Sequence, residues 1–176
     1  MVTSVNTEIE KDANIRERHA GIYEGKSTKN LVCGMIAAGG NPLDWVPEGG
    51  ESKEEVDRIL EMFLQKLGAL VDSGNDRKVI LVVTHGAVLV HLWNYLLRQS
   101  DKYMLLNWKP EFFKVSRNTN YFLLDIGKSL AAGGPREMEV LIAHGNDHLK
   151  SLGDDALSSF FKEDKSVTAL SECMQQ

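Results

Sequence analysis

The chain has 176 residues, of which 43% are hydrophobic and 26% are charged, a balance typical of one globular domain with a real core. Its longest apolar run, Val79 to Val83, is much too short for a membrane span. The formal net charge of −5 disfavours nucleic acid as the main partner, but it leaves room for a local cluster of donors that binds a phosphate.

The two cysteines, Cys33 and Cys173, lie far apart in the sequence and form no metal-type pair. We interpret both as free thiols in a reducing compartment, and we expect a cytoplasmic protein. The chain does not begin with basic residues followed by an apolar stretch, so we expect no signal peptide. Without internal repeats, the sequence predicts a single domain over 1–176, with a core at about 15–150. The polar tail at 162–176 has a composition that favours disorder.

Two helices are predicted in the first half of the chain. Ser27 is a suitable N-cap for a helix from Thr28 to Ala38. Ser52 followed by Glu55 is a capping-box pattern, and it predicts the start of a second, long helix. The apolar face of this second helix consists of Val56, Ile59, Leu60, Phe63, Leu67, Leu70 and Val71.

Strands and helices alternate in the second half. The run Val79 to Val83, rich in β-branched residues, predicts a strand covered on both faces. Thr84-His85-Gly86 ends this run and starts a further helix. The apolar positions of that helix are Val88, Leu89, Leu92, Trp93, Leu96 and Leu97. Further strands are predicted at Tyr121 to Ile126 and at Met138 to Ala143. This order predicts an α/β fold with helices on both faces of the sheet.

The end of the predicted strand at Val83 is a suitable place for a ligand. In open α/β sheets, ligands bind beyond the carboxyl ends of the strands. Gly86 lets the backbone turn sharply and lets a ligand approach closely. The following helix directs free N–H groups and the positive end of its dipole to the same point. A histidine such as His85 therefore suits a phosphate there, although a histidine that only completes a turn is the simpler alternative.

Four motifs occur in the order found in one known family. They are Ile15 to Gly21 with Glu24-Gly25 after it, Pro47 to Ser52 before a helix, Val82 to Gly86, and Asn118-Thr119 before an apolar strand. The first resembles an acid-bearing segment, the second a Gly-Glu-Ser loop, and the third a histidine motif. On these motifs the chain resembles the histidine phosphatase superfamily, the phosphoglycerate mutase-like proteins.

The resemblance extends from about Ile15 to Leu149. The Pro-x-Gly-Gly-Glu loop and Asp147-His148-Leu149 are most similar to TIGAR-type fructose-2,6-bisphosphatases. The family implies a three-layer sandwich, with a mostly parallel sheet and helices on both faces. It also implies a cytoplasmic, metal-independent hydrolase without a cofactor, linked to the regulation of glycolysis. Such an enzyme hydrolyses a phosphomonoester on a sugar phosphate such as fructose 2,6-bisphosphate through a phosphohistidine intermediate.

The resemblance also implies roles for individual residues. Glu17 matches the proton donor of the family, and His85 matches the second histidine, which stabilises the transferring phosphoryl group. The expected substrate contacts are Arg18, His19, Gly86 and Asn118. His19 does not match the nucleophile, because polar residues rather than a buried strand precede it and Ala20 separates it from Gly21.

The nucleophile motif of the family is the feature that this sequence does not show. Residues 1–16 contain no apolar strand followed by Arg-His-Gly. We therefore expect a fold without its first strand-helix portion, and a phosphatase that is weak or inactive. The alternatives are a non-catalytic isoform or pseudoenzyme that binds phosphorylated ligands, and a phosphoglycerate mutase-type enzyme. We expect a phosphorylated small molecule as partner, no nucleic acid, no membrane, and self-association through an exposed sheet edge.

A second histidine cluster near the end of the sequence offers alternatives. His144, before Gly145, resembles the second histidine motif in its letters, and His144 and His148 have the spacing of a helical metal pair. No third ligand is evident, and Asn146-Asp147-His148 is a poor start for an apolar helix. We therefore expect no metal site here and place the second histidine motif at His85.

Overall fold

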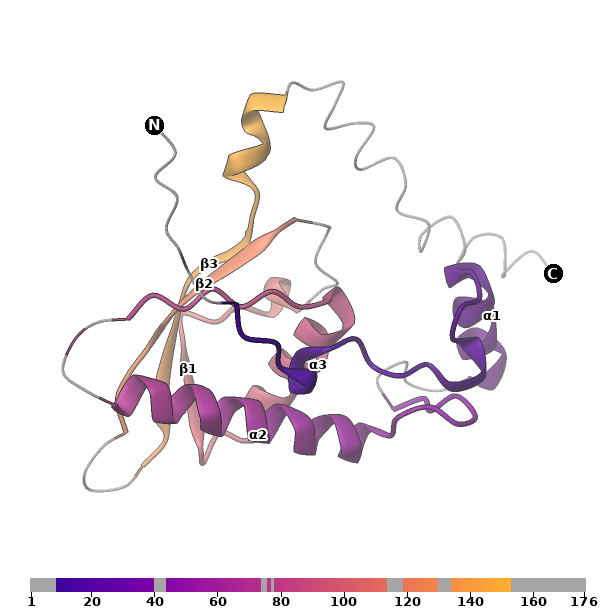
Figure 1. The fold of residues 1–176 in the computed structure, drawn as a ribbon, viewed down its shortest axis with the longest axis horizontal. Helices are drawn as coiled ribbons and strands as arrows, with labels where there is room; N and C mark the ends of the chain where they lie inside the picture. The colour runs from indigo at the N-terminus through magenta and orange to yellow at the C-terminus, as the bar shows by residue number, and fades with distance from the viewer. Residues whose placement is uncertain are drawn as a thin grey trace.

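A computed structural model of the chain describes residues 9–39, 44–73, 76, 78–113, 119–129 and 134–152. The helices are α1 (Thr28–Ala38), α2 (Lys53–Asp72) and α3 (Gly86–Arg98), and the strands are β1 (Tyr103–Leu106), β2 (Tyr121–Ile126) and β3 (Arg136–Gly145) (Figure 1). Short 3-10 helices occur at Ala13–Ile15, Gly21–Tyr23, Pro110–Phe112 and Asp147–Leu152. The predicted substrate contact Asn118 and the predicted tail at 162–176 lie outside the described residues.

The three strands form one sheet in the order β1-β3-β2. The central strand β3 runs parallel to β1 and antiparallel to β2. Met138 of β3 is aligned with Leu105 on one side and with Ile126 on the other. The mixed α/β class predicted from the sequence is confirmed. The strand predicted at Met138 to Ala143 is longer at both ends, and β1 was not predicted.

The N-caps predicted for the first two helices are confirmed. The Ser27 hydroxyl accepts a hydrogen bond from the backbone N–H of Asn30 at the start of α1. At the start of α2, the Ser52 hydroxyl accepts from the Glu55 N–H, and the Glu55 carboxylate accepts from the Ser52 N–H. These bonds satisfy backbone donors that have no partner within the helix, so they fix where each helix begins.

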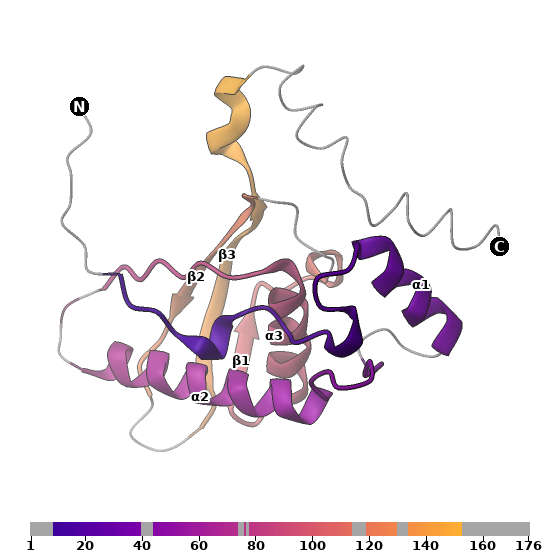
Figure 2. The same cartoon turned by 45° about the vertical axis from the view of Figure 1, so that its right-hand side comes forward.

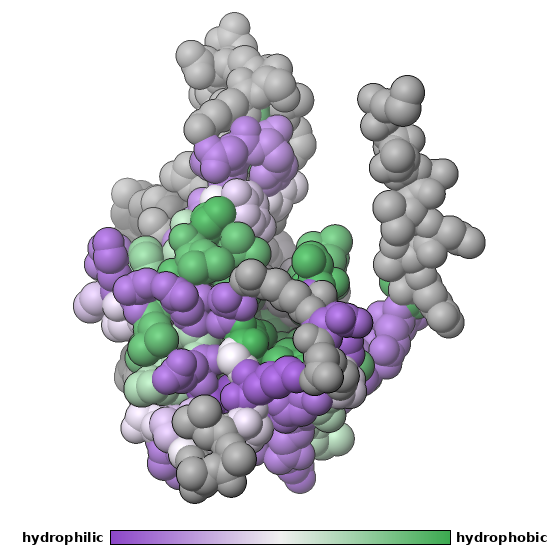
Figure 3. All heavy atoms as spheres, turned by 90° about the vertical axis from the view of Figure 1, so that its left-hand side faces the viewer, coloured by the Kyte–Doolittle hydropathy of each residue, from purple (hydrophilic) through white to green (hydrophobic). Residues whose placement is uncertain are grey.

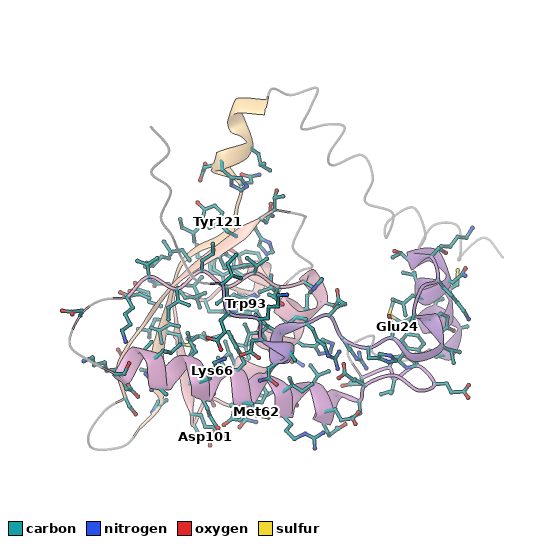
Figure 4. All side chains as sticks on the ribbon, viewed as in Figure 1. Glu24, Met62, Lys66, Trp93, Asp101 and Tyr121 are labelled. Atoms are coloured by element: carbon teal, nitrogen blue, oxygen red, sulfur yellow. The ribbon has the colours of Figure 1, made fainter. Side chains whose placement is uncertain are left out.

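The core lies between the sheet and the two helices α2 and α3. Its buried members are Val56, Leu60, Leu64, Val88, Trp93, Tyr95, Leu96, Tyr103, Met138 and Val140. Trp93 is 1% exposed, its ring centroid lies 5.2 Å from that of Phe122, and Figure 4 shows it among the side chains packed beside the strands. The other face of the sheet carries exposed apolar side chains at Met104, Leu123 and Leu141. In the described residues, α2 and α3 therefore cover one face.

The prediction of a strand at Val79 to Val83 is wrong. These residues form an extended segment between α2 and α3 that belongs to no strand, and all five side chains are exposed. An apolar run becomes a strand only where a neighbouring strand pairs with its backbone, and none of the described strands does so. Figure 3 shows that hydrophobic residues reach the surface beside hydrophilic ones on one side of the molecule.

Helix α1 lies apart from the sheet and from α2, as Figures 1 and 2 show from two directions. It carries Cys33, which is disulfide-bonded in the structure. The prediction of a free thiol at this position is therefore wrong. The second cysteine of the sequence, Cys173, lies outside the described residues. None of the described helices is both long and apolar enough to cross a membrane.

Candidate active site

The acid-bearing segment, Ile15 to Gly21, is held against the loop Pro47 to Ser52 that leads into α2. The backbone N–H of Ile22 donates to the Glu48 carbonyl over 2.9 Å, and the N–H of Glu51 donates to the His19 carbonyl over 3.0 Å. Gly21 makes this approach possible because it has a φ of 57°, and a Cβ at this position would lie 2.0 Å from the Glu48 carbonyl oxygen. The two motifs, distant in sequence, therefore form one unit.

The Glu51 carboxylate organises this unit. It accepts two hydrogen bonds from the Arg16 guanidinium, of 2.5 and 3.1 Å, and one of 2.7 Å from the backbone N–H of His19. Partial burial alone would raise the pKa of Glu51, but the bonds from His19 and Arg16 outweigh it and hold that pKa below its usual value. Glu51 is therefore an anion at neutral pH, with Oε1 bonded to the Arg16 guanidinium and Oε2 bonded to both Arg16 and the His19 N–H.

The Arg18 guanidinium holds backbone carbonyls. Its Nη2 donates to the carbonyls of Trp45 and Glu51, at 2.8 and 2.7 Å, and its Nε donates to the Glu51 carbonyl at 3.0 Å. Burial lowers the pKa of Arg18, while the Glu51 carboxylate opposes this shift. In this structure Arg18 therefore fixes the loop before α2, and its Nη1 alone is directed elsewhere, 3.5 Å from Nε2 of His91.

His91 is a buried histidine of α3 and takes no part in the exposed site. It is 5% exposed, and burial together with the positive charge of Arg18 lowers its pKa to about 4. At neutral pH its ring is therefore uncharged. A small pocket beneath the loop is lined by polar groups of Arg16, Arg18 and His91 and by apolar side chains of α2 and α3. Neither Glu17 nor His85 lines this pocket.

Glu17 and His85 lie together on the surface. Oε2 of Glu17 is 3.5 Å from Nδ1 of His85, and about half of each side chain is exposed. The other carboxylate oxygen of Glu17 accepts a hydrogen bond from the Arg18 N–H at 3.1 Å. Next to His85, the Thr84 hydroxyl donates to the Ile15 carbonyl over 2.6 Å, and this bond ties the two segments together. The two residues expected to act on one phosphate are thus adjacent.

The N-terminus of α3 completes this arrangement. His85 is the N-cap residue, its side chain makes no capping bond, and Gly86 is the first residue of the helix. The first N–H groups of a helix have no partner within it, and they carry the positive end of its dipole. His85 therefore combines an imidazole, a neighbouring carboxylate and free backbone donors at one point. It follows an extended segment, however, and not the strand that we expected.

The His19 side chain is bonded to the backbone of its own segment. Its Nδ1 accepts a hydrogen bond of 3.1 Å from the Gly21 N–H, so its proton-bearing nitrogen is Nε2, and its side chain is exposed. Its backbone is fixed on both sides by Glu51, as described above. The expected substrate contact at Asn118 lies outside the described residues.

The second histidine cluster contacts residues other than Glu17 and His85. His144 lies in β3, and its Nε2 is 3.1 Å from the Phe112 carbonyl oxygen, while the His148 ring lies 5.9 Å from that of Tyr121. Among the described residues, no group of three or more histidine, cysteine, aspartate or glutamate side chains is placed to hold a metal ion.

Sequence reasoning missed the roles of Arg16 and Glu51. Both belong to motifs that the resemblance had already assigned to one site. Their opposite charges were the available signal, because two charged residues in motifs that share one site are candidates for an ion pair. The sequence alone does not tell which of the several glutamates in these motifs meets which arginine.

The amino-acid sequence matches the model of one protein family. The histidine phosphatase superfamily (branch 1) matches residues 2–113, more than half of the chain, and the chain belongs to this superfamily. A similar protein is fructose-2,6-bisphosphatase TIGAR B of Danio rerio, which is 39% identical over 61 residues. This similarity covers 35% of the chain and 24% of the relative, so the chain spans about a quarter of the length of the protein it matches.

Proposed function

We propose that the site at Glu17 and His85 binds the phosphoryl group of a phosphorylated small molecule, a sugar phosphate such as fructose 2,6-bisphosphate. The observation that carries this proposal is the 3.5 Å approach of the two side chains at the N-terminus of α3. His85 and the first amides of α3 hold the phosphoryl oxygens, as helix N-termini do for phosphate in general. Gly86, His19 and Asn118 are the further contacts that the family resemblance suggests.

Glu17 is the proposed proton donor. In the mechanism of the family, a histidine attacks phosphorus, the bond to the sugar oxygen breaks, and the acid protonates that oxygen as it leaves. Water then attacks the phosphohistidine, and inorganic phosphate and the free histidine result. The position of Glu17 supports its role, because its carboxylate is half exposed and lies beside the histidine that would hold the phosphoryl group.

The 176-residue chain is proposed to be a weak or inactive phosphatase. Its sequence has no Arg-His-Gly motif after an apolar strand, and no described histidine other than His85 lies at the start of a long helix. Loss of a nucleophile that works as a unit with its partners costs on the order of 10⁶ in rate. Phosphate binding is expected to persist, at reduced affinity.

Non-catalytic binding of phosphorylated ligands is the second candidate. The observation that favours it over catalysis is that, among the described residues, no histidine other than His85 lies at the N-terminus of a long helix. No observation specifically favours a mutase activity. A cytoplasmic location and a role in the regulation of glycolysis stay predictions from the family. The disulfide at Cys33 removes the argument that free thiols gave for the location.

An activity assay tests this proposal. Hydrolysis of fructose 2,6-bisphosphate and of an aryl phosphate is measured in the presence of a chelator, for the chain and for His85→Ala. His148→Ala is the matched control, because it removes an exposed histidine of a different cluster. We expect turnover near background in all three. Substantial turnover that disappears only in His85→Ala would contradict the weak-phosphatase proposal.

A further inference from the structure

The contact between His91 and Arg18 joins α3 to the acid-bearing segment. Nε2 of the His91 ring lies 3.5 Å from Nη1 of Arg18, and His91 is 5% exposed. A guanidinium only donates hydrogen bonds, so the ring can act as its partner only when Nε2 carries no proton. The contact therefore requires the neutral form of the histidine, with its proton on Nδ1.

The other donors of Arg18 hold the loop before α2. Nη2 donates to the Trp45 carbonyl, which lies before the loop, and Nη2 and Nε both donate to the Glu51 carbonyl near its end. The guanidinium is planar and rigid, so its N–H groups keep fixed directions relative to one another. A displacement at Nη1 therefore also displaces Nη2 and Nε. In this way the state of the His91 ring is transmitted to the loop.

The charged groups around the His91 ring oppose a proton on it. They come from the acid-bearing segment, the loop and the helices α2 and α3, and they are Arg16, Arg18, Glu51, Lys53, Asp57 and Arg98. Both carboxylates of this set accept hydrogen bonds from arginines of the same set. Their charges are thus already compensated. A proton on the ring would therefore place a second cation beside Arg18.

We propose that His91 is a proton-sensitive positioning residue for Arg18. The neutral ring holds the guanidinium against the carbonyls of Trp45 and Glu51. When Nε2 takes up a proton from water, the ring repels the guanidinium, because Arg18 keeps its own charge at every pH at which the chain is folded. The loop Pro47 to Ser52 is then freed from Arg18. This device concerns the loop and does not depend on the proposed phosphate site.

NMR spectroscopy of the chain over the pH range in which His91 titrates tests the proposal. The Nε–H signal of Arg18 reports its bond to the Glu51 carbonyl, the ring signals of His91 report the proton, and the indole signal of the buried Trp93 reports the core. We expect the Arg18 signal to shift with the same midpoint as the His91 ring, whose pKa is about 4, while Trp93 keeps its folded signal. An Arg18 signal that stays constant while His91 titrates, or that changes only together with Trp93, would overturn the proposal.

Two variants separate His91 from carboxylates that titrate in the same range. His91→Gln keeps a neutral acceptor that cannot take up a proton, so its Arg18 signal should stay near its neutral-pH position at pH 4. His148→Gln, at an exposed histidine of a different cluster, should behave as the unmodified chain does. An equally large shift of the Arg18 signal in His91→Gln would overturn the proposal. The titration of the unmodified chain requires neither variant to fold, so it tests the proposal by itself.

Discussion

Nδ1 of His85 lies 3.5 Å from Oε2 of Glu17, although the two residues belong to motifs at opposite ends of the first half of the chain. The bond from the Thr84 hydroxyl to the Ile15 carbonyl brings their backbones together. Glu51 and Arg18 then hold the acid-bearing segment against the loop before α2. The candidate site is therefore positioned by side chains that bond to backbone groups of neighbouring segments.

Replacement of Glu51 should loosen the acid-bearing segment. Glu51→Ala removes the acceptor of the His19 N–H and the partner of Arg16, so we expect hydrogen exchange at the His19 amide to become faster. Amide exchange measured by NMR checks this. Glu54→Ala, at an exposed glutamate in the first turn of α2, is the control. Equal exchange rates at His19 in both variants would contradict the role of Glu51.

The buried His91 should make stability depend on pH. Its pKa in the folded chain is about 4, against 6.5 for an exposed histidine. Between these values the unfolded chain binds the proton and the folded chain does not, so stability is complete above about pH 6.5 and falls as the pH decreases towards 4. The loss from this group is at most about 3 kcal/mol. We expect the free energy of unfolding to change less with pH in His91→Gln, and urea denaturation at several pH values measures this dependence. An equal pH dependence of stability in the chain and in His91→Gln would contradict this role of His91.

Leu60 should be a major contributor to the core. Its side chain is 1% exposed in α2, and Leu60→Ala is expected to lower the free energy of unfolding by about 2–5 kcal/mol, because it leaves a cavity. Met62 lies two residues further along α2 and is 53% exposed. Met62→Ala should therefore change stability by no more than about 0.5 kcal/mol. Chemical denaturation of both variants measures the difference, and similar losses for the two would show that the core is misassigned.

The capping box at the start of α2 should contribute measurably to stability. Ser52→Ala removes the acceptor of the Glu55 N–H, and the expected cost is about 1 kcal/mol. Thermal and urea denaturation measure it, with the exposed Ser100→Ala variant as the control. The effect should be retained at high salt, since the bond is to a backbone donor rather than to a distant charge. Equal free energies of unfolding for Ser52→Ala and Ser100→Ala would contradict the assignment of the cap.

The features that local chemistry determines could be predicted from the sequence. Ser27 and Ser52 mark the starts of α1 and α2, because capping depends only on residues within one turn. The strand at Tyr121–Ile126 follows its own apolar pattern. Glu17 and His85 were expected together only through the family resemblance, since no local rule brings distant segments to one point.

The features that depend on distant partners could not be predicted in this way. Val79 to Val83 has the composition of a buried strand, but a strand also needs a neighbour for its backbone, and the sequence does not reveal whether one is present. β1 is short, and a mixed, aromatic segment surrounds it, so its pairing with β3 gave no periodic signal. The roles of Arg16 and Glu51 likewise depend on which distant charges meet.

An NMR titration with inorganic phosphate tests the central claim, that Glu17, His85 and the start of α3 form one phosphate site. We predict saturable chemical-shift changes centred on the Gly86 amide and the His85 ring. These changes should be much weaker in His85→Ala and preserved in His148→Ala. Shift changes that are centred elsewhere, or that persist unchanged in His85→Ala, would contradict the assignment of this site.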